Sequence, residues 1–446
     1  MTRVIYLLIV LMFLGFQQKA FSQNQNDSLL EHATLDDCIH YALQHQPYLQ
    51  QSILDEEITE RQIKTRLADW YPQVNFDYNL QHYFSLPTSV FGADSTGKKR
   101  PVKAGVVNSS TLGFSLNQAI FNRDVLLASR TAEDVRKQVR QATESNKIDV
   151  VTEVSRAFYD VLSTQQQIAL LNEDIIRLQN SLKVAYQQYQ GGLVDKVDYK
   201  RATISLNNAL AQRKATQEAL IAKEANLKNQ MGYPVEAPLS LQYDSSQMER
   251  DAILDTLQQV NYQSRIEYQL LQTQIRLQQY NLKYYKWGFL PSVSAFANYN
   301  LAYLNDNLAH LYDNTFPNSY AGVRLSFPIF QGTKRTQQIR QTELELKRTN
   351  YDLQALKNNV NTQFVQAMSS YKSNLVDYNI LKENVAIAEE VYNTIQLQYK
   401  AGVKTYLDVI IAETDLRTAQ VNYTNALFNI LSSKLDVQRA TGNIQF

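Results

Sequence analysis

The sequence predicts a mainly α-helical fold with a smaller β portion, built as two copies of one unit. Three observations predict it. The pattern Tyr-x-x-Gly-x-x-x-x-x-Asp occurs at 189–198 and again, 210 positions later, at 399–408. On both sides of each glycine, apolar residues recur at alternating steps of three and four, as in helices that pack as coiled coils. Elsewhere, four short segments alternate apolar with polar residues, which is typical of half-buried strands.

The two copies align without a gap over 189–232 and 399–442. Glycine accepts the positive φ that a sharp turn requires. Each copy is therefore predicted as a helix, a turn at 190–194 or 400–404, and a helix that returns alongside the first. The apolar positions before the two turns follow the same register, and they are Ile168, Leu171, Ile175, Leu178, Leu182, Ala185 and Tyr189 in one copy and Tyr378, Leu381, Val385, Ala388, Tyr392, Ile395 and Tyr399 in the other.

The chain begins with a stretch that has the features of a cleaved secretory signal, predicted at 1–22. Arg3 supplies a positive charge, 4–16 an apolar core, and 20–22 a small-x-small ending. No later run of about 18 apolar residues follows, so no transmembrane helix is expected in the mature chain. Cys38 is the only cysteine, and an exported chain without a disulfide must be stabilised by packing and assembly.

Charge and histidine content exclude several functional classes. The 446 residues include 44 basic and 43 acidic side chains, a formal net charge of +1, which gives no field to attract nucleic acid. The histidines do not recur between the copies and have no carboxylate or cysteine at metal-ligand spacing, so we expect no catalytic, cofactor or metal site and no enzyme. They are His32, His40, His45, His82 and His310.

The first repeat is predicted at 23–232. A capping signal at Thr34 begins an amphipathic helix, which can break at Pro47. A β-hairpin at about 72–121 follows, with a polar loop at 85–109. Its strands are indicated by two alternating sets of apolar residues, Val74, Phe76, Tyr78 and Leu80 in the first strand and Leu112, Phe114 and Leu116 in the second.

After the hairpin, a helix almost free of glycine and proline continues to Tyr189. At 1.5 Å per residue it would be about 100 Å long, far beyond the usual globular helix, so it must line something long. The second repeat, 251–446, is predicted to contain the same elements: a helix at about 251–285, a hairpin at about 291–330, a long helix, a tip and a return helix. The connecting segment at 233–250 is predicted as a small equatorial element.

Four strands with one apolar face need either a cover in water or a bilayer. Every predicted helix already has a seam of its own, so we expect transmembrane strands, whose backbone is satisfied by closing a barrel. Four strands cannot close one, and about eight is the minimum. Two chains would give eight strands with a filled interior, and three would give twelve with a lumen. Aromatic residues at both helix-to-strand junctions indicate the membrane interface, with burial in a core as the alternative; they are Trp70, Tyr71, Trp287 and Phe289.

The order of these elements, repeated twice, resembles the TolC-like outer-membrane efflux proteins, the outer-membrane factors of tripartite export systems. The resemblance runs from about Thr34 to Gly442. It implies a homotrimer in which four strands per chain form a twelve-stranded outer-membrane β-barrel, continued across the periplasm by a duplicated, long α-helical coiled-coil barrel. It also implies contact with outer-membrane lipid, with a periplasmic membrane-fusion adaptor and with an inner-membrane pump of the RND or ABC type.

The resemblance further implies a periplasmic gate near the helix tips. Its residues would be Asp198, Tyr399, Lys404 and Asp408. In the pooled helices of several chains, Tyr399 and Lys404 are both expected to reach the Asp198 carboxylate. Two positions depart from the family pattern, because Val197 replaces a hydroxyl residue and Ile411 stands where a second pore-facing acid would be.

The turns themselves are expected to contact the adaptor. The residues concerned are Gly191, Gly192, Leu193, Ala401, Gly402 and Val403. A simpler alternative exists for two of the gate residues, since Asp198 and Asp408 stand near the starts of the return helices, where a carboxylate is stabilised by the helix dipole.

Two classes of function fit the sequence. The first is the passive outer-membrane exit duct of a tripartite efflux pump, and the exit duct of a type I protein-secretion system shares every feature of it. The second is a periplasmic coiled-coil adaptor or structural rod, which leaves the four amphipathic strands unexplained. The duct is therefore preferred, and the predicted location is the outer membrane with the helical part in the periplasm.

Overall fold

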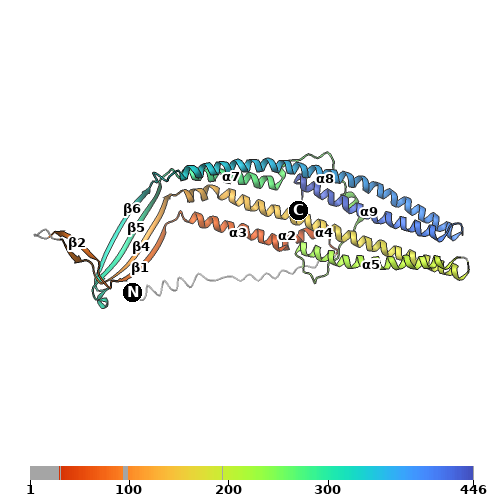
Figure 1. Cartoon of the computed structure of the whole chain (residues 1–446), viewed down its shortest axis with the longest axis horizontal. Coiled ribbons are helices and arrows are strands. Elements are labelled where there is room, and N and C mark those ends of the chain that lie inside the picture. The colour runs from red at the N-terminus through yellow and green to blue at the C-terminus, as the bar shows by residue number, and fades with distance from the viewer. Residues whose placement is uncertain (1–29, 31, 94–98, 193, 445–446) are drawn as a thin grey trace.

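The computed structural model describes residues 30, 32–93, 99–192 and 194–444. The molecule is elongated, with a β-sheet at one end and two helical tips at the other (Figure 1). Most of the described residues are helical, which confirms the mainly α-helical fold. Within these ranges, no helix is both long and apolar enough to cross a membrane. The predicted signal at 1–22 and the tip residue Leu193 lie outside the described residues.

A capping box and a proline divide the first helical stretch in two. The Thr34 side chain accepts a hydrogen bond from the Asp37 N–H, and the Asp37 carboxylate accepts one from the Thr34 N–H. Pro47 begins a new helix, because the first helical position needs no N–H donor. The helices of this half are α2 Leu35–His45, α3 Pro47–Ala68, α4 Arg123–Gln190 and α5 Lys196–Met231.

Two very long helices set the length of the molecule. Helix α4 has 68 residues, and α8, Lys334–Lys400, has 67; each is therefore about 100 Å long. Each ends at a turn whose glycine has a positive φ, 71° at Gly192 and 75° at Gly402. The chain then returns as α5 after the first turn and as α9, Tyr406–Thr441, after the second. The two turns therefore lie at the same end of the molecule (Figure 1).

The helix expected at about 251–285 is wrong in its first part. The structure has instead α6 Ser245–Asp251, the short 3-10 helix η1 Tyr262–Ser264 and α7 Ile266–Trp287. Ile253 and Leu257 stand four positions apart, as on a helix, but their side chains are 72% and 86% exposed. The intervening backbone is held by distant partners, since the Leu254 N–H donates to the Tyr371 hydroxyl at 2.7 Å. Tertiary contacts thus replace the expected helical hydrogen bonds.

The polar loop expected at 85–109 also contains structure that was not predicted. Strands β2 Thr88–Ala93 and β3 Lys99–Lys103 pair antiparallel, and this small sheet extends beyond the main one (Figure 1). Proline is depleted in strands, so Pro101 and its basic neighbours gave no strand signal. Residues 94–98, between the two strands, lie outside the described residues.

Four long strands form one antiparallel sheet in the order β1, β4, β5, β6. They are β1 Gln73–His82, β4 Asn108–Phe121, β5 Ser292–Asn305 and β6 Thr315–Ser326. One row across the sheet places Phe76 opposite Phe114 and Phe114 opposite Tyr299, whereas the next row contains Asp77 and Asn300. Because successive side chains point to opposite faces, the sheet has an apolar and a polar face. Strands β1 and β6 are its two edges.

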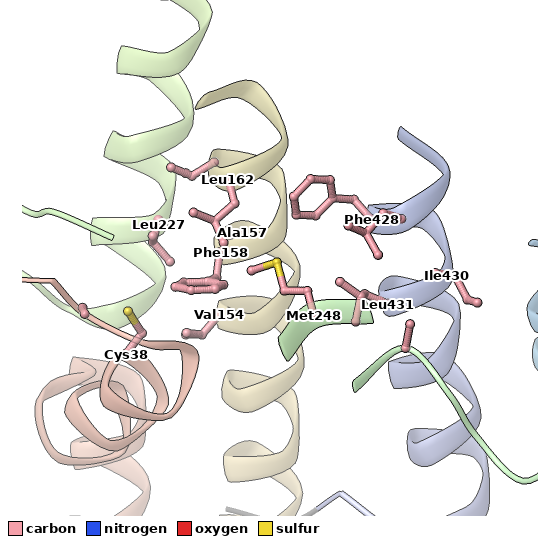
Figure 2. Packing of buried hydrophobic residues seen from close by; sticks show 14 of the residues in the cluster. Cys38, Val154, Ala157, Phe158, Leu162, Leu227, Met248, Phe428, Ile430 and Leu431 are labelled. Carbon is pink, nitrogen blue, oxygen red and sulfur yellow. The ribbon is translucent and has the colours of Figure 1, made fainter. Parts of the chain in front are cut away.

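The main apolar core lies where helices of both halves meet (Figure 2). Phe158 of α4, at the centre of this core, is 1% exposed. Burying a large side chain of this kind contributes about 1.5–3 kcal/mol. A parallel bridge between Ala33 and Leu241 attaches the connecting segment beside this core. The other helices contribute Cys38 of α2, Leu227 of α5, Met248 of α6 and Phe428 and Leu431 of α9.

Candidate gate at the helix tips

The two helical tips pack against each other through a small apolar cluster. It contains Ala185, Ala202, Tyr399, Tyr406 and Val409, which come from α4, α5, α8 and α9. Beyond it the turns are open, because a Cβ atom added at Gly192 or Gly402 would meet no heavy atom within 4 Å. The tips are therefore joined below the turns, and the turns themselves are free to contact other molecules.

Tyr399 forms a hydrogen bond between the two tips, but with a different partner from the one predicted. Its hydroxyl group donates to Gln188 Oε1 of α4 at 2.5 Å, rather than to Asp198 as expected. Asp198 is close enough for its charge to act, since burial and then Asp198 raise the pKa of Tyr399. Gln188 lies on α4, one helical turn before Gly192, and its side chain faces α8. Sequence spacing alone does not reveal this direction.

Lys404 and Asp408 interact within their own tip, and the expected contact of Lys404 with Asp198 in the pooled helices of several chains stays a prediction. Lys404 Nζ lies 3.9 Å from Asp408 Oδ1. The Asp408 carboxylate accepts from Thr405 N at 2.9 Å and from Thr405 Oγ1 at 2.8 Å. These bonds, and to a smaller extent Lys404, lower the pKa of Asp408. Asp408 thus completes the capping box of α9, as in the simpler alternative.

The start of the first return helix is built differently. Asp195 caps α5, and its side chain accepts from the Val197 N–H at 3.3 Å. Asp198 lies in the first turn of this helix, so the positive end of the helix dipole also stabilises its negative charge. The two acids that the repeat pattern aligns therefore differ, because only Asp408 makes a capping box.

A buried charge cluster that the sequence did not indicate lies farther from the turns, between α4 and α9. It consists of Asp174 and Arg177 of α4 and Glu413 and Arg417 of α9. Asp174 lies 3.5 Å from Arg177 Nη2 and 3.3 Å from Arg417 Nη1. Glu413 is 3% exposed and only 4.0 Å from Arg177 Nε. Within the described part of the chain, neither Glu413 oxygen has a hydrogen-bond partner.

The environment of Glu413 favours its protonated form. Its pKa is raised to about 7, chiefly because burial disfavours the charged carboxylate and secondly because Asp174 is negative. Arg177 and Arg417 act in the opposite direction but do not cancel the rise. Burial and the Glu413 charge also raise the pKa of Tyr392 on α8. The protonation of this carboxylate, which lies between two helices without a hydrogen bond among the described residues, therefore changes near pH 7.

Sequence reasoning missed this cluster because charged residues on long helices usually face solvent. The available signal was weak. Asp174 and Arg177 stand three positions apart beside the apolar seam residue Ile175, and Glu413 and Arg417 stand four apart beside Ala412. Only the packing of α4 on α9 brings the two pairs together.

The aromatic residues predicted at the membrane interface lie where helices meet strands. Trp70 and Tyr71 follow α3, and Trp287 and Phe289 adjoin the end of α7. Tyr71 is 69% exposed, and Trp70 and Phe289 are also exposed, while Trp287 is half-buried. Exposure of this kind argues against the core alternative in the single chain. Among the described residues, no group of three or more His, Cys, Asp or Glu side chains could hold a metal ion.

Comparison with known proteins adds four findings. A family described as outer membrane efflux protein matches residues 38–233 and 269–443. Outer membrane protein TolC of Escherichia coli is 24% identical over 382 residues, which cover 80% of this chain and 75% of that protein. The alkaline protease secretion protein AprF of Pseudomonas aeruginosa is 21% identical over 89% of this chain and 82% of its own. The solved structure of CusC superposes with a TM-score of 0.75 at 15% identity, covering 96% of this chain and 98% of that one.

Proposed function

This chain belongs to the outer membrane efflux protein family, and from that premise we propose that three copies form a passive exit duct. The duct would receive substrates from a periplasmic adaptor and an inner-membrane pump. The family consists of outer-membrane channels, and the protein is located in the outer membrane with its helical part in the periplasm. The observation that carries the proposal is a sheet with an exposed apolar face and two open edges, joined to two long helical hairpins.

The edges of the sheet support a closed assembly. Strands β1 and β6 each have one neighbour in the single chain, and unpaired backbone groups cost several kcal/mol each in lipid. Pairing β1 of one copy with β6 of the next would satisfy both edges. Three copies would give twelve strands, because four per chain cannot close a barrel and eight leave no lumen. The repeats at 23–232 and 251–446, joined by 233–250, would then supply two helical hairpins per copy.

The polar face of the sheet suits the inside of such a barrel. Asp77 and Asn300 lie in one row with Asn318, and Asn300 Nδ2 donates to Asn318 Oδ1 at 3.0 Å. The opposite face presents Phe76 and Phe114, both exposed in the single chain. Apolar residues outside and polar residues inside are the pattern of outer-membrane barrels.

Assembly is the direct test of this proposal. We expect native mass spectrometry of the detergent-solubilised protein to show three chains, and the same preparation should insert channels into planar lipid bilayers. A stable monomer that forms no channel would contradict the proposed duct. Family membership and the exposed strands already argue against the coiled-coil adaptor or structural rod.

A protein-secretion duct remains the second candidate, and the similarity to AprF favours it. The same geometry would serve either system, so the partner decides between them. Cross-linking in the native membrane, followed by identification of the captured inner-membrane protein, separates the two. A pump of the RND type would support efflux, and an ABC transporter with a protein substrate would support type I secretion.

We propose that the tips close the periplasmic end, with Asp198, Tyr399, Lys404 and Asp408 around the gate. The turns would contact the adaptor through Gly191, Gly192, Ala401, Gly402 and Val403, and the same role is proposed for Leu193. Two features support this contact surface. Val403 is exposed at the tip, and both turns lie open beyond the packed cluster.

The hydrogen bond between Tyr399 and Gln188 gives a prediction for the gate. Tyr399→Phe removes a bond that contributes about 1 kcal/mol per chain. If three copies open together, the open population should rise by up to about 100-fold. Single-channel conductance in planar bilayers is the measurement, and we expect longer and more frequent open states.

Lys404→Ser tests a second gate residue and should have the smaller effect. Lys404 interacts only loosely with Asp408, 3.9 Å away and near solvent, and exposed ion pairs contribute little. Its removal should therefore raise the open population much less than Tyr399→Phe does. Opening by Lys404→Ser without opening by Tyr399→Phe would assign closure to an ion pair between neighbouring copies, and the Tyr399 bond would lose its proposed role.

A further inference from the structure

A positively charged cavity lies where three junctions between strands and helices meet. Its volume is about 460 Å³. The start of α4, the end of α7 and the start of α8 all contribute to its lining. Arg123, Lys334 and Arg335 are the basic residues in this lining, and Asp124 is the only carboxylate. The lining therefore has an excess of two positive charges.

Gly288 brings two of these basic residues close together. A Cβ atom at Gly288 would lie 2.6 Å from Arg123 Nη1 and 3.6 Å from Arg335 Cδ. Any larger side chain would have to displace the Arg123 guanidinium group. The glycine thus permits two like charges, one from each half of the chain, to converge on the same small volume.

Arg335 holds the cavity in shape. It is 9% exposed, and its guanidinium group donates to the Gly288 carbonyl at 2.8 Å and to the Pro328 carbonyl at 2.6 Å. It also lies over the Phe289 ring, 4.6 Å from the centroid. These contacts tie the end of α7 to the start of α8, so Arg335 acts as a positioning residue.

Among the described residues, Arg123 and Lys334 have no anionic partner. Arg123 lies over the Tyr284 ring at 4.5 Å, and the neighbouring Asp124 accepts a hydrogen bond from the Tyr284 hydroxyl at 2.6 Å. Across the ranges that the structure describes, neither Arg123 nor Lys334 forms an ion pair with a carboxylate. Two cations without an ion pair, beside a cavity whose lining has an excess of positive charge, favour an anion that comes from outside the chain.

The position of the cavity indicates what kind of anion is available. Trp287 and Leu290 line it, and Phe289 beside it is exposed. Aromatic residues at this place mark the level of the lipid head groups. Basic pockets at that depth bind phosphate-bearing head groups.

We propose that this cavity binds the phosphate group of an anionic phospholipid, with Arg123 and Lys334 as the contacts to the phosphate. The inference rests on the proposed placement of the strands in the membrane. The lipid satisfies the two unpaired cations, and its acyl chains extend along the apolar face of the sheet. The site therefore anchors the junction of all three elements to the inner leaflet.

Native mass spectrometry with added phosphatidylglycerol tests the site on the intact assembly. A basic residue near a lipid surface changes the affinity about five-fold. Lys334→Gln and Arg123→Gln should therefore each weaken binding about five-fold, and the double variant about 25-fold. Lys347→Gln is the matched control, because this exposed lysine lies on the same helix, about 20 Å from Lys334 along the helix axis. It should leave binding unchanged.

The outcomes separate this inference from the proposed function. The trimer mass shows whether the assembly exists, and lipid adducts report on the site alone. Equal binding of phosphatidylglycerol and phosphatidylcholine by a normal trimer would overturn the site and leave the duct intact. Displacement of the lipid by millimolar inorganic phosphate would overturn the lipid assignment in favour of a soluble phosphate. Unchanged affinity in both variants would also overturn the proposal.

Discussion

Gly232→Ala is expected to lower the free energy of unfolding by about 3 kcal/mol or more. Gly232 ends α5 with φ 68°, and the left-handed conformation costs an alanine about 1–2 kcal/mol. A Cβ atom there would also lie 2.7 Å from the His45 carbonyl oxygen and 2.9 Å from Gln46 Cα. These are backbone atoms at the junction of α2 and α3, so they cannot rotate away. Forced overpacking of this kind adds about 1–3 kcal/mol.

Gly402→Ala separates the two contributions, because Gly402 has a similar φ of 75° and no heavy atom within 4 Å of the added Cβ. Gly402→Ala should lower the free energy of unfolding only by the cost of the left-handed conformation, about 1–2 kcal/mol. Gly442, with φ 73° and the Ser264 backbone 2.9 Å away, should behave like Gly232. Thermal unfolding of the three variants in detergent makes the comparison. Equal losses at Gly232 and Gly402 would show that the close approach to α2 and α3 is not rigid.

Glu413→Gln should raise stability at neutral and alkaline pH and flatten its dependence on pH. The folded chain keeps a proton on Glu413 up to pH about 7, whereas the unfolded chain releases it near the ordinary value of about 4.3. The folded state therefore binds more protons in this window, so wild-type stability falls as pH rises through it. The loss is about 4 kcal/mol per chain once Glu413 is ionised in both states. A neutral glutamine avoids this loss.

Thermal unfolding at several pH values between about 4 and 8 measures the effect. Asp415→Asn is the control, since Asp415 is exposed two positions away on the same helix and should leave the pH profile unchanged. The charged and titratable groups that face Glu413 remain in both variants, and they are Asp174 and Arg177 of α4, Tyr392 of α8 and Tyr406 and Arg417 of α9. A wild-type slope that persists in Glu413→Gln would mean that another group titrates.

Periodicity in the sequence could predict the long helices and the strands, because both depend on local spacing. Before Gly192 and Gly402, apolar residues recur at steps of three and four, which indicates a helix face that packs within one hairpin. The alternation of apolar and polar residues from Val74 to Leu80 indicates a strand with one apolar face, whichever strand it pairs with. These features were predicted from neighbouring residues alone.

Features that depend on distant partners could not be predicted in this way. The segment after Asp251 is not helical because Tyr371 supplies its hydrogen bond from more than a hundred positions away. The partner of Tyr399 proved to be Gln188, since the choice between two polar groups depends on rotation of the helices. The pairing of Asp174 with Arg417 likewise appears only when α4 packs on α9.

The pairing of β4 with β5 constrains the order in which the protein folds. Residues that meet in this pair, such as Asn108 and Asn305, are far apart in the chain, whereas each helical hairpin joins neighbouring segments. Local hairpins form early, and distant strand pairs form late because a long loop must close. A chain whose export stops before residue 292 would present β4 with an open edge. Such an arrested chain is the species most prone to pair with other copies and aggregate.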